Sequence, residues 1–554
     1  MVTPLTTYHF YRDKWDDYQS LNKQFEWEIP STFNIADYVC DRWASDGDRI
    51  ALLVDEDNGE QSVYTFSDVK RITNQLANYL TQEGVSQGDK IGVTGVQRAE
   101  TAFTHIAAWK VGAISVPLST KFGPDSFRYR FDDCKMKYCL ADEICLEDIR
   151  SAREASNVTP DLITPGASTN IGSEITFKDA IRSQPHEYNC ANTDPDDDAL
   201  VIYTSGTTGQ PKGVRHGHRV LLGHLPFYVT NYLNMELCET ERIWTPIEWS
   251  WVASVVSMLL CSWFYGVTVV ANPTDQFTPG EALQILNKYD VSVFFTAPTV
   301  LRMLSQYDAQ RTYDLDTVRV IPTGGESLNE AVTDWCREQF GDVAIHEGYG
   351  QTEANNLIGD CTALAPSKGQ PIGLPGVGHE LAILDPDTHE QVSEGEIGEI
   401  AVRYGDDPVC FKSYLNKPEE TEKKVQDEWL LTGDLGIQDA DGYVAFKGRK
   451  DAVIISSGYR IAPQEIEESL TNHDAVAEAG VVGVNDETKG EIPQAFVVLA
   501  DEYEPSDSLQ SDLQEFVKSN LAKYEYPRRL TFVKHLPRSA SGKLRRAELT
   551  EWIE

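Results

Sequence analysis

A stretch rich in glycine and threonine has the composition of a phosphate-binding loop. It reads YTSGTTGQPKGV at 203–214 and directly follows the apolar run ALVI at 199–202. Glycine lets backbone N–H groups turn toward an anion, the hydroxyls add donors, and Lys212 adds a cation. The stretch is not a Walker A loop, and the chain has neither a GxGxxG fingerprint nor a GxSxG nucleophile elbow. The residues expected to bind phosphate are Thr204, Ser205, Gly206, Thr207, Thr208, Gly209 and Lys212.

Three later segments carry residue types suited to the rest of a nucleotide. They are GGES at 324–327, EGYGQTE at 347–353 and LTGD at 431–434. Together with the first loop, and in this order, they resemble the motifs of the adenylate-forming superfamily, which includes acyl-CoA synthetases, peptide-synthetase adenylation domains and luciferases. The resemblance extends along almost the whole chain. It implies an enzyme that binds ATP with Mg²⁺ and activates a carboxylic acid.

The resemblance assigns a role to each of these segments. Thr352 is expected to contact the α-phosphate, and Glu353 to help to hold Mg²⁺. Asp434 is expected to bind both ribose hydroxyls, and Arg449, fifteen residues later, the ribose and phosphate. The ring of Tyr349 is expected to pack on the face of adenine. The other residues expected around the nucleotide are Gly325, Glu326, Ser327, Glu347, Gly348, Gly350 and Gln351.

The last hundred residues resemble the small mobile domain of the superfamily. Asp451 matches its hinge, and Ser457, Gly458 and Arg460 match the loop that receives coenzyme A. Lys543 matches the catalytic lysine. The implied reaction has two steps: the acid attacks the α-phosphorus of ATP while Lys543 and Mg²⁺ stabilise the growing charge. The domain then turns, and the coenzyme A thiolate displaces AMP from the acyl adenylate.

The identity of the acid depends on a pocket for which Trp249 and Gly350 are the candidate residues. Acetate-activating relatives carry a Trp-Trp pair where this chain has Tyr349-Gly350, so a deeper pocket is expected and a tryptophan at 350 should favour acetate. GYGQTE, SGYRIAP and PRSASGK most resemble the medium-chain acyl-CoA synthetases. Trp249 is either a gate beside the carboxylate or a core residue. A short-chain or aryl acid is the alternative to a medium-chain acid.

Two other classes of function fit the sequence less well. A module that loads an amino acid onto a carrier protein usually offers an aspartate for the ammonium group, whereas 245–257 offers only Glu248, and no carrier segment follows Lys543. A non-enzymatic nucleotide-binding relative would be expected to lack Lys543 or Glu353. His216 and His346 flank the motifs, as does His218. We interpret all three as structural, because a carboxylate nucleophile needs no general base.

The pattern of apolar residues predicts an α/β fold with a large and a small domain. Helices at 67–82, 101–110, 280–288 and 299–306 alternate with strands at 90–94, 114–117, 291–296 and 318–322, which is typical of helices covering parallel sheets. A β subdomain is expected at 380–448. We predict an N-terminal domain at 1–448, a hinge at 449–451 and an α+β lid at 452–554. The uncharged stretch 249–271 is long enough to span a bilayer, but its serines and Gly266 favour a buried helix, a turn and a core strand.

The charge balance is strongly acidic. The 48 Lys and Arg against 87 Asp and Glu give a formal net charge of −39, which excludes a generic nucleic-acid binder. Such a surface is tolerable where salt screens it, so the chain resembles a protein of a salt-accumulating, haloarchaeal cytoplasm. Ten scattered cysteines without ligand spacing, and an N-terminus without a secretory pattern, favour a cytoplasmic enzyme. The expected partners are small molecules, and the oligomeric state, a homo-oligomer included, is left open.

Overall fold

The computed structural model describes most of the chain as two compact units. The larger unit comprises 1–368, 373–380 and 403–430, and the smaller one 369–372, 381–402 and 431–554. The residues that the structure describes are 4–56, 59–166, 174–204, 210–274, 276–307, 313–325, 328, 330–368, 372–456, 459–486, 489–500, 502–521, 526–538 and 544–553.

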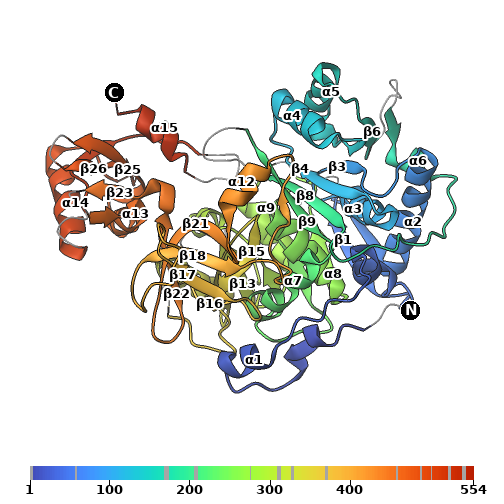
Figure 1. Cartoon of the computed structure of the whole chain (residues 1–554), viewed down its shortest axis with the longest axis horizontal. Helices are drawn as coiled ribbons and strands as arrows, with labels where there is room; N and C mark the ends of the chain where they lie inside the picture. The colour runs from blue at the N-terminus through green and yellow to red at the C-terminus, as the bar shows by residue number, and fades with distance from the viewer. Residues whose placement is uncertain are drawn as a thin grey trace. The chain divides into compact units, whose positions relative to one another are not determined.

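A nine-stranded sheet forms one layer of the larger unit (Figure 1). Its six inner strands are parallel, whereas at its two edges β2 pairs antiparallel with β1, β15 with β14, and β16 with β15. In order across the sheet the strands are β16 (Leu374–Pro375), β15 (Ala354–Gly359), β14 (Ala344–Gln351), β13 (Val320–Gly324), β12 (Val293–Phe294), β10 (Arg242–Trp244), β11 (Thr268–Ala271), β1 (Ile50–Asp55) and β2 (Gln61–Thr65).

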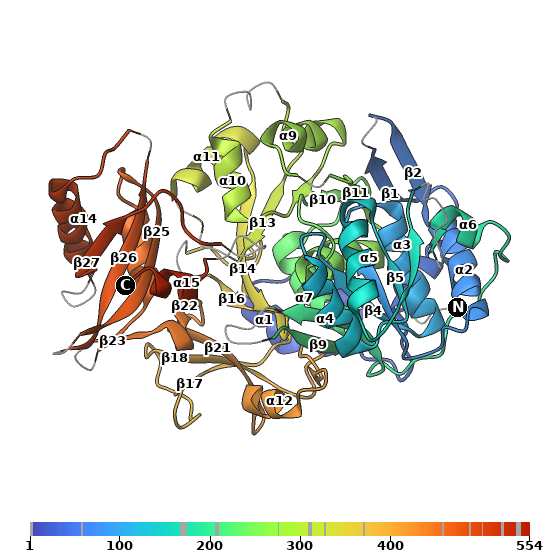
Figure 2. The same cartoon turned by 90° about the horizontal axis from the view of Figure 1, so that it is seen from above.

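Three amphipathic helices pack beside this sheet and lie close together in Figure 2. They are α9 (Pro279–Lys288), α10 (Pro298–Ser305) and α11 (Glu330–Phe340). α9 begins at Pro279 because Thr278 caps it, its side chain accepting a hydrogen bond from the N–H of Glu281. The buried side chains of Leu283, Leu286 and Ile321 form part of the core between helices and sheet.

An eight-stranded sheet forms the second layer of the larger unit. Its strands from β8 to β7 are parallel, and β9 and β19 extend it in antiparallel fashion. In order they are β19 (Ser413–Tyr414), β9 (Lys212–Gly217), β8 (Asp198–Thr204), β4 (Ile114–Leu118), β3 (Lys90–Thr94), β5 (Tyr138–Leu140), β6 (Asp161–Thr164) and β7 (Glu174–Thr176). The other α-helices of this unit are α1 (Tyr18–Gln24), α2 (Phe66–Gln82), α3 (Ala99–Val111), α4 (Pro124–Cys134), α5 (Leu146–Ala155), α6 (Phe177–Ile181), α7 (Val220–Phe227), α8 (Ser262–Phe264) and α12 (Pro418–Lys424).

The uncharged stretch at 249–271 folds as a buried helix, a turn and a core strand, as expected. A π-helix at Ala253–Cys261 leads into α8, Gly266 turns the chain with φ +69°, and β11 enters the middle of the nine-stranded sheet. Within the described part of the chain, no helix is long and apolar enough to cross a membrane.

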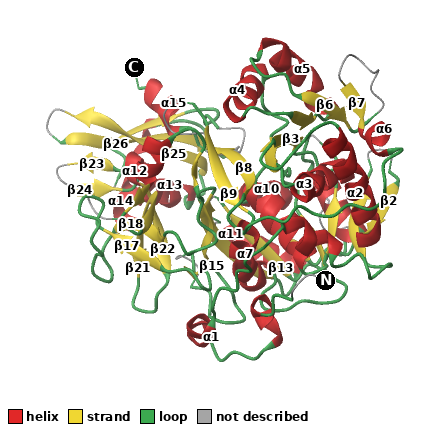
Figure 3. Cartoon of the chain, turned by 45° about the vertical axis from the view of Figure 1, so that its right-hand side comes forward, coloured by secondary structure: helices red, strands yellow, loops and turns green. Residues whose placement is uncertain are grey.

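The smaller unit contains the β subdomain and the C-terminal residues (Figure 3). The strands of the first sheet are β17 (Leu381–Leu384), β18 (Gly398–Arg403), β21 (Trp429–Gln438) and β22 (Val444–Arg449), and β20 (Val425–Gln426), which belongs to the larger unit, pairs with the first residues of β21. Those of the second are β24 (Tyr459–Ile461), β23 (Ile454–Ser456), β26 (Gly490–Leu499) and β25 (Val476–Asp486), with β27 (Arg529–Phe532) on β26. Its helices are α13 (Pro463–Thr471), α14 (Asp507–Asn520) and α15 (Arg546–Glu551).

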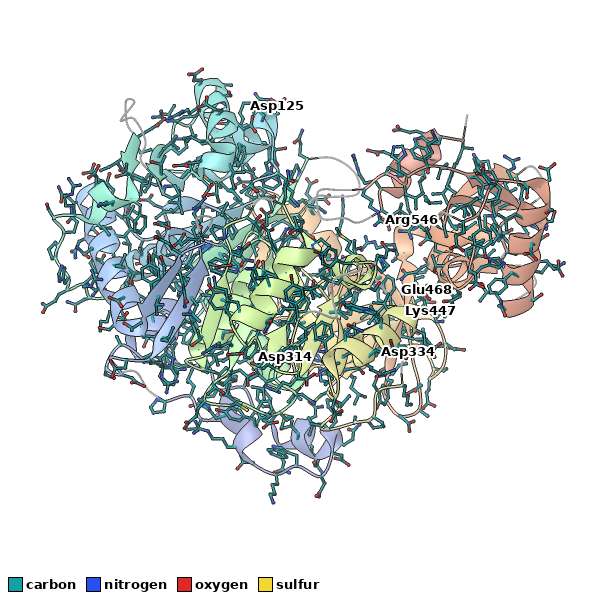
Figure 4. All side chains as sticks on the ribbon, turned by 180° about the vertical axis from the view of Figure 1, so that it is seen from behind. Asp125, Asp314, Asp334, Lys447, Glu468 and Arg546 are labelled. Atoms are coloured by element: carbon teal, nitrogen blue, oxygen red, sulfur yellow. The ribbon has the colours of Figure 1, made fainter. Side chains whose placement is uncertain are left out.

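The expected α/β class is confirmed, with one difference in the sheets. Both large sheets are mixed, because antiparallel strands complete their edges, and a lone apolar pattern does not reveal strand direction. The chain passes for the last time from the larger to the smaller unit at 430–431, since most of the β subdomain belongs to the same compact unit as the C-terminal residues. A hinge at 449–451 concerns movement rather than packing and stays a prediction. Acidic residues at the surface include Asp125, Asp314 and Asp334 (Figure 4).

Candidate active site

The glycine- and threonine-rich stretch is the connection of a β-hairpin in the larger unit. β8 and β9 pair in antiparallel register, with Thr204 opposite Lys212 and Tyr203 opposite Gly213. The two ends of the connection therefore lie opposite each other on neighbouring strands, and Lys212 is the first residue of β9. Ser205–Gly209, which the sequence singled out for backbone contacts to phosphate, lie outside the described residues.

The ammonium group of Lys212 lies against an aromatic ring and a carboxylate. Its Nζ is 4.7 Å from the ring centroid of Tyr414 and 3.3 Å from Oε2 of Glu420. Tyr414 lies on β19, which pairs with β9 and places Tyr414 opposite Val214. The position of Lys212 is thus fixed by a strand that comes two hundred residues later in the chain.

Glu353 has a carboxylate with one oxygen engaged and one open. Tyr414 donates its hydroxyl to Oε1 at 2.5 Å. Among the described residues, none donates a hydrogen bond to Oε2. The side chain is largely buried, at 9% exposure, so its charge is shielded from water and calls for a compensating group. A hard, single carboxylate oxygen is a ligand that suits Mg²⁺, which is commonly held by one or two carboxylates together with substrate phosphates.

Thr352 precedes Glu353 at the turn between β14 and β15, and a buried histidine holds its backbone. Nε2 of His216, on β9, lies 2.8 Å from the carbonyl oxygen of Thr352, so it carries the proton and donates it. Burial lowers the pKa of His216 to about 4, which keeps the ring neutral. Among the described residues, none hydrogen-bonds to the hydroxyl of Thr352. His216 therefore joins the phosphate hairpin to the 347–353 segment as a structural residue.

His346 and His218 are also buried and neutral. Burial lowers the pKa of His346 to about 4 and that of His218 to about 3. The N–H of Thr362 donates to Nε2 of His346, which leaves Nδ1–H to donate to the carbonyl of Asn231 at 2.7 Å. The N–H of Ile35 donates to Nδ1 of His218. These contacts fit the interpretation of both rings as structural.

The two segments expected around adenine lie on neighbouring parallel strands. β13 and β14 pair so that Thr323 faces Glu347 and Gly324 faces Gly348. A Cβ on Gly324 would lie 2.4 Å from the carbonyl oxygen of Gly348, so only glycine permits this approach. Gly325, the next residue, has φ +88° and turns the chain out of the strand. Glu326 and Ser327 lie outside the described residues, and the N–H of Leu328 donates to Oε1 of Glu347.

Gly350 lies at an irregularity in the pairing of β14 with β15, between Tyr349 and Gln351. A Cβ at this position would be 2.4 Å from the backbone nitrogen of Asn356 on β15. A tryptophan at 350 would therefore have to displace β15 before it could narrow any pocket. The expectation that a tryptophan at 350 favours acetate therefore depends on how β15 adjusts, and not on side-chain volume alone.

Trp249 is fully buried, and its backbone N–H donates to the carbonyl of Gly95 at 2.7 Å. Trp251, two residues later, is 37% exposed. Glu248 is held by Thr120 and Ser250, whose hydroxyls donate to its carboxylate at 3.0 and 2.7 Å. These donors stabilise the Glu248 carboxylate within the protein.

In the smaller unit, Arg449 joins the residue expected to bind ribose to the expected hinge. β21 and β22 pair with Asp434 opposite Arg449. Nη1 of Arg449 is 3.0 Å from Oδ1 of Asp434, and its Nε is 3.1 Å from Oδ1 of Asp451. Burial opposes ionisation of Arg449, but the two carboxylates outweigh it and raise its pKa. The three residues thus form one chain of ion pairs.

The segments assigned to coenzyme A and to the catalytic lysine are described only at their edges. Ser457, Gly458 and Lys543 lie outside the described residues, and Arg460 is described only as backbone of β24. An isolated bridge between Arg538 and Leu544 closes the connection that carries Lys543.

Helix α15, which follows this connection, is anchored by an ion pair to α13. Nη2 of Arg546 lies 2.5 Å from Oε2 of Glu467, and the N–H of Val481 donates to Oε1 of the same carboxylate. Lys447, labelled in Figure 4, also forms an ion pair with α13, its Nζ lying 2.7 Å from Oε1 of Glu465.

Tyr414 and Glu420 are the residues of this site that the sequence did not reveal. They lie in FKSYLNKPEET at 411–421, which has no glycine-rich pattern, and its acidic pair Glu419-Glu420 reads as the first turn of an exposed helix. Their contribution arises from the pairing of β19 with β9, a long-range contact without a local signal.

Known proteins resemble this chain over almost its whole length. Residues 40–415 match the family described as AMP-binding enzyme, and residues 465–543 its C-terminal domain. Acyl-coenzyme A synthetase ACSM4, mitochondrial, of Rattus norvegicus is 32% identical over 98% of this chain and 96% of its own length. The uncharacterized acyl-CoA ligase YtcI of Bacillus subtilis (strain 168) is 33% identical over 94% and 96%, respectively.

Solved structures have the same fold. The anthranilate CoA ligase AuaEII, in complex with anthranoyl-AMP, gives a TM-score of 0.86 at 28% identity, covering 95% of this chain and 98% of its own. A benzoate CoA ligase from Burkholderia xenovorans LB400 gives 0.81 at 24% identity, with 93% and 99% covered, and supports the fold alone. Because the first family match covers well over half of the chain, the chain belongs to the AMP-binding enzymes of the adenylate-forming superfamily, and the expectation of an acid–thiol ligase is confirmed.

Proposed function

We propose that this enzyme is an AMP-forming acyl-CoA synthetase that activates a medium-chain carboxylic acid with ATP and transfers the acyl group to coenzyme A. One observation carries the proposal: Lys212 and Glu353, from motifs far apart in the sequence, contact the same tyrosine in one compact unit. A cation and an open carboxylate held side by side suit a triphosphate with its metal ion.

In the first step the acid carboxylate attacks the α-phosphorus of ATP, and pyrophosphate leaves. The ammonium of Lys212 and the hydroxyl of Thr352 are the described groups that we assign to phosphate, and Lys543 is the proposed donor to the charge that develops. Mg²⁺, held by Oε2 of Glu353 together with phosphate oxygens, would neutralise part of that charge. No protein nucleophile is required, because the substrate supplies a carboxylate.

In the second step the coenzyme A thiolate attacks the acyl carbonyl, and AMP leaves. We assign Asp434 to the ribose hydroxyls and Arg449 to the ribose and phosphate, and their ion pair fixes the carboxylate of Asp434 on β21. Ser457, Gly458 and Arg460 are proposed to receive coenzyme A after rotation about Asp451. The domain scheme of 1–448, 449–451 and 452–554 is part of this proposal.

The choice of a medium-chain acid is supported by relatives named acyl-coenzyme A synthetase ACSM4 and ACSM3. An aryl acid is the second candidate, because the anthranilate CoA ligase AuaEII has a TM-score of 0.86 with this chain. The exposed ring of Trp251 could contact either kind of acid.

A panel of acids tests the proposal directly. Linear acids from acetate to dodecanoate, with benzoate and anthranilate, are assayed for pyrophosphate release with and without coenzyme A. Maximal kcat/KM with a linear acid of intermediate length supports the proposal. A maximum with benzoate or anthranilate supports the aryl alternative, and the absence of acid-dependent pyrophosphate release refutes acid activation.

Separate half-reactions test the role of Lys543. Lys543→Ala should slow adenylate formation by at least ~10²-fold, the scale for the loss of one preorganised donor. A preformed acyl adenylate should still react with coenzyme A at the wild-type rate. Gly458→Leu should have the opposite pattern, with thioester formation impaired. Equal losses in both half-reactions for either variant would contradict these assignments.

A cytoplasmic location is part of the proposal. All ten cysteines are free thiols, as expected in a reducing compartment. The expected partners are the acid, ATP and coenzyme A.

A further inference from the structure

Tyr414 lies between two functional groups that the sequence assigned to different motifs. Its hydroxyl donates to Oε1 of Glu353 at 2.5 Å, and its ring centroid is 4.7 Å from Nζ of Lys212. All three residues belong to the larger unit. One buried side chain therefore contacts both the proposed metal ligand and the proposed phosphate cation.

The backbone around Tyr414 is bonded to both motifs as well. Ser413 and Tyr414 pair with Arg215 and Val214 of the phosphate hairpin. Three residues earlier, the N–H of Phe411 donates to the carbonyl of Glu353 at 2.8 Å. The segment 411–414 thus fixes the distance between the hairpin and the 347–353 segment.

The hydroxyl has a specific effect on Glu353. A carboxylate with both oxygens free rotates about its terminal bond, whereas a short hydrogen bond to Oε1 fixes its plane and directs Oε2 away from Tyr414. Groups that orient a metal ligand in this way strongly affect metal affinity, although they do not touch the metal. The ring of Tyr414 has a separate effect: its negative face attracts the ammonium of Lys212, and this attraction does not depend on the hydrogen bond between the hydroxyl and Glu353.

We propose that Tyr414 is a positioning residue for the adenylation site, which orients Glu353 toward Mg²⁺ through its hydroxyl and holds Lys212 at the triphosphate through its ring. The inference rests on the proposed function for its account of what Glu353 and Lys212 bind. It assigns one role to the hydroxyl of Tyr414 and another to its ring, and two substitutions separate these roles.

Tyr414→Phe removes the hydroxyl and keeps the ring. Mn²⁺ serves as the probe, and its binding in the presence of a non-hydrolysable ATP analogue is followed by electron paramagnetic resonance. The affinity for Mn²⁺ should fall by about tenfold or more, the range seen when a group that orients a metal ligand is lost. Metal-free binding of ATP, measured by calorimetry in EDTA, should stay unchanged because the ring still faces Lys212.

Tyr414→Leu removes the ring as well. It should lower the affinity for Mn²⁺ to the same extent and also weaken the metal-free binding of ATP severalfold. Tyr404→Phe is the matched control: Tyr404 lies ten residues earlier in the same compact unit, and its hydroxyl donates to the carbonyl of Lys412 at 2.6 Å rather than to Glu353. This control should bind Mn²⁺ and ATP like the wild type. Thermal unfolding of each variant reports whether the fold is kept.

Equal Mn²⁺ affinity for Tyr414→Phe and Tyr404→Phe would overturn the role of the hydroxyl. Equal metal-free ATP binding by Tyr414→Phe and Tyr414→Leu would overturn the role of the ring. The proposed function is tested separately by acid-dependent exchange of pyrophosphate into ATP by the wild type. If the wild type shows no such exchange, acid activation is refuted. The titrations with Mn²⁺ and with ATP would still test the roles of the hydroxyl and the ring of Tyr414.

Discussion

Asp360 offers a test of how burial shifts the charge of a group next to the nucleotide segments. Its side chain follows β15 in the larger unit and is 6% exposed. Two long hydrogen bonds, from the N–H of Glu347 and the hydroxyl of Ser367, reach Oδ2 at 3.4 Å each. Burial raises the pKa of Asp360 from 3.8 to about 7, and these two bonds oppose the rise only weakly.

The size of the effect follows from the shift. A rise from 3.8 to about 7 corresponds to about 4 kcal/mol, since one pKa unit is equivalent to about 1.4 kcal/mol. Between these pH values the folded protein keeps a proton that the unfolded chain has released. Stability must therefore fall as pH rises from about 4 to about 7, and the loss is complete above that window.

Asp360→Asn is the perturbation, because asparagine keeps the shape and stays neutral. The free energy of unfolding is measured in urea by tryptophan fluorescence, which reports the larger unit because ten of the eleven tryptophans lie there. Relative to the wild type, the variant should gain stability progressively between pH 4 and pH 7. The total gain should approach about 4 kcal/mol, and infrared spectra should lose one protonated carboxyl band that the wild type titrates near neutral pH.

Asp198→Asn is a control of opposite sign. Asp198 is also partly desolvated, but Lys412 and Arg215 outweigh burial and lower its pKa. Its contribution to stability is present above the unfolded pKa and is lost as pH falls through the lower folded pKa, so Asp198→Asn should destabilise the protein at neutral pH and less so in acid. A difference between wild type and Asp360→Asn that does not change with pH would refute the reasoning.

Three further changes have defined outcomes. Lys110→Met should lower the free energy of unfolding by about 3–5 kcal/mol, because the fully buried ammonium donates to Asp41 and Asn74 at 2.6 Å each, and the variant leaves Asp41 only the longer 3.5 Å contact with Lys70; urea unfolding with no loss would contradict this. Gly350→Ala should lower the free energy of unfolding by about 1–3 kcal/mol, since its Cβ would lie 2.4 Å from the backbone of Asn356. Unchanged stability would mean that β15 shifts without an energetic penalty. Dialysis from concentrated KCl into dilute buffer should lower Tm, because the formal net charge is −39; an unchanged Tm would oppose adaptation to salt.

The sequence predicted the elements that depend on local pattern. α9, with its proline and threonine cap, begins within one residue of the expected position, and α2 likewise. The pairing of Asp434 with Arg449 could also be expected, because a hairpin of suitable length brings residues fifteen apart into register. Such relations need few residues between the partners, so composition and spacing carry the information.

Contacts that depend on the order and pairing of strands could not be predicted from the sequence. The exchange of Trp-Trp for Tyr349-Gly350 predicted a change in side-chain volume, but the direction of a Cβ at 350 depends on how β14 pairs with β15. In the same way, residue type alone does not distinguish Trp249 from Trp251 as a candidate for contact with the acid. Only the fold shows that the first is buried and the second is 37% exposed.

Tyr414 shows why motif analysis finds the groups that meet a ligand and misses those that hold them. Glycine, threonine, lysine and acidic residues are recognisable because their types and spacing suit phosphate and metal. A tyrosine in FKSYLN has no such signal, and its value comes from β19 joining β9 beside Glu353. If the hydroxyl and ring of Tyr414 act as proposed, the geometry of the site depends on a strand of two residues, and a search for supporting groups should begin from the hydrogen-bond donors to the engaged oxygens of expected ligands rather than from motifs.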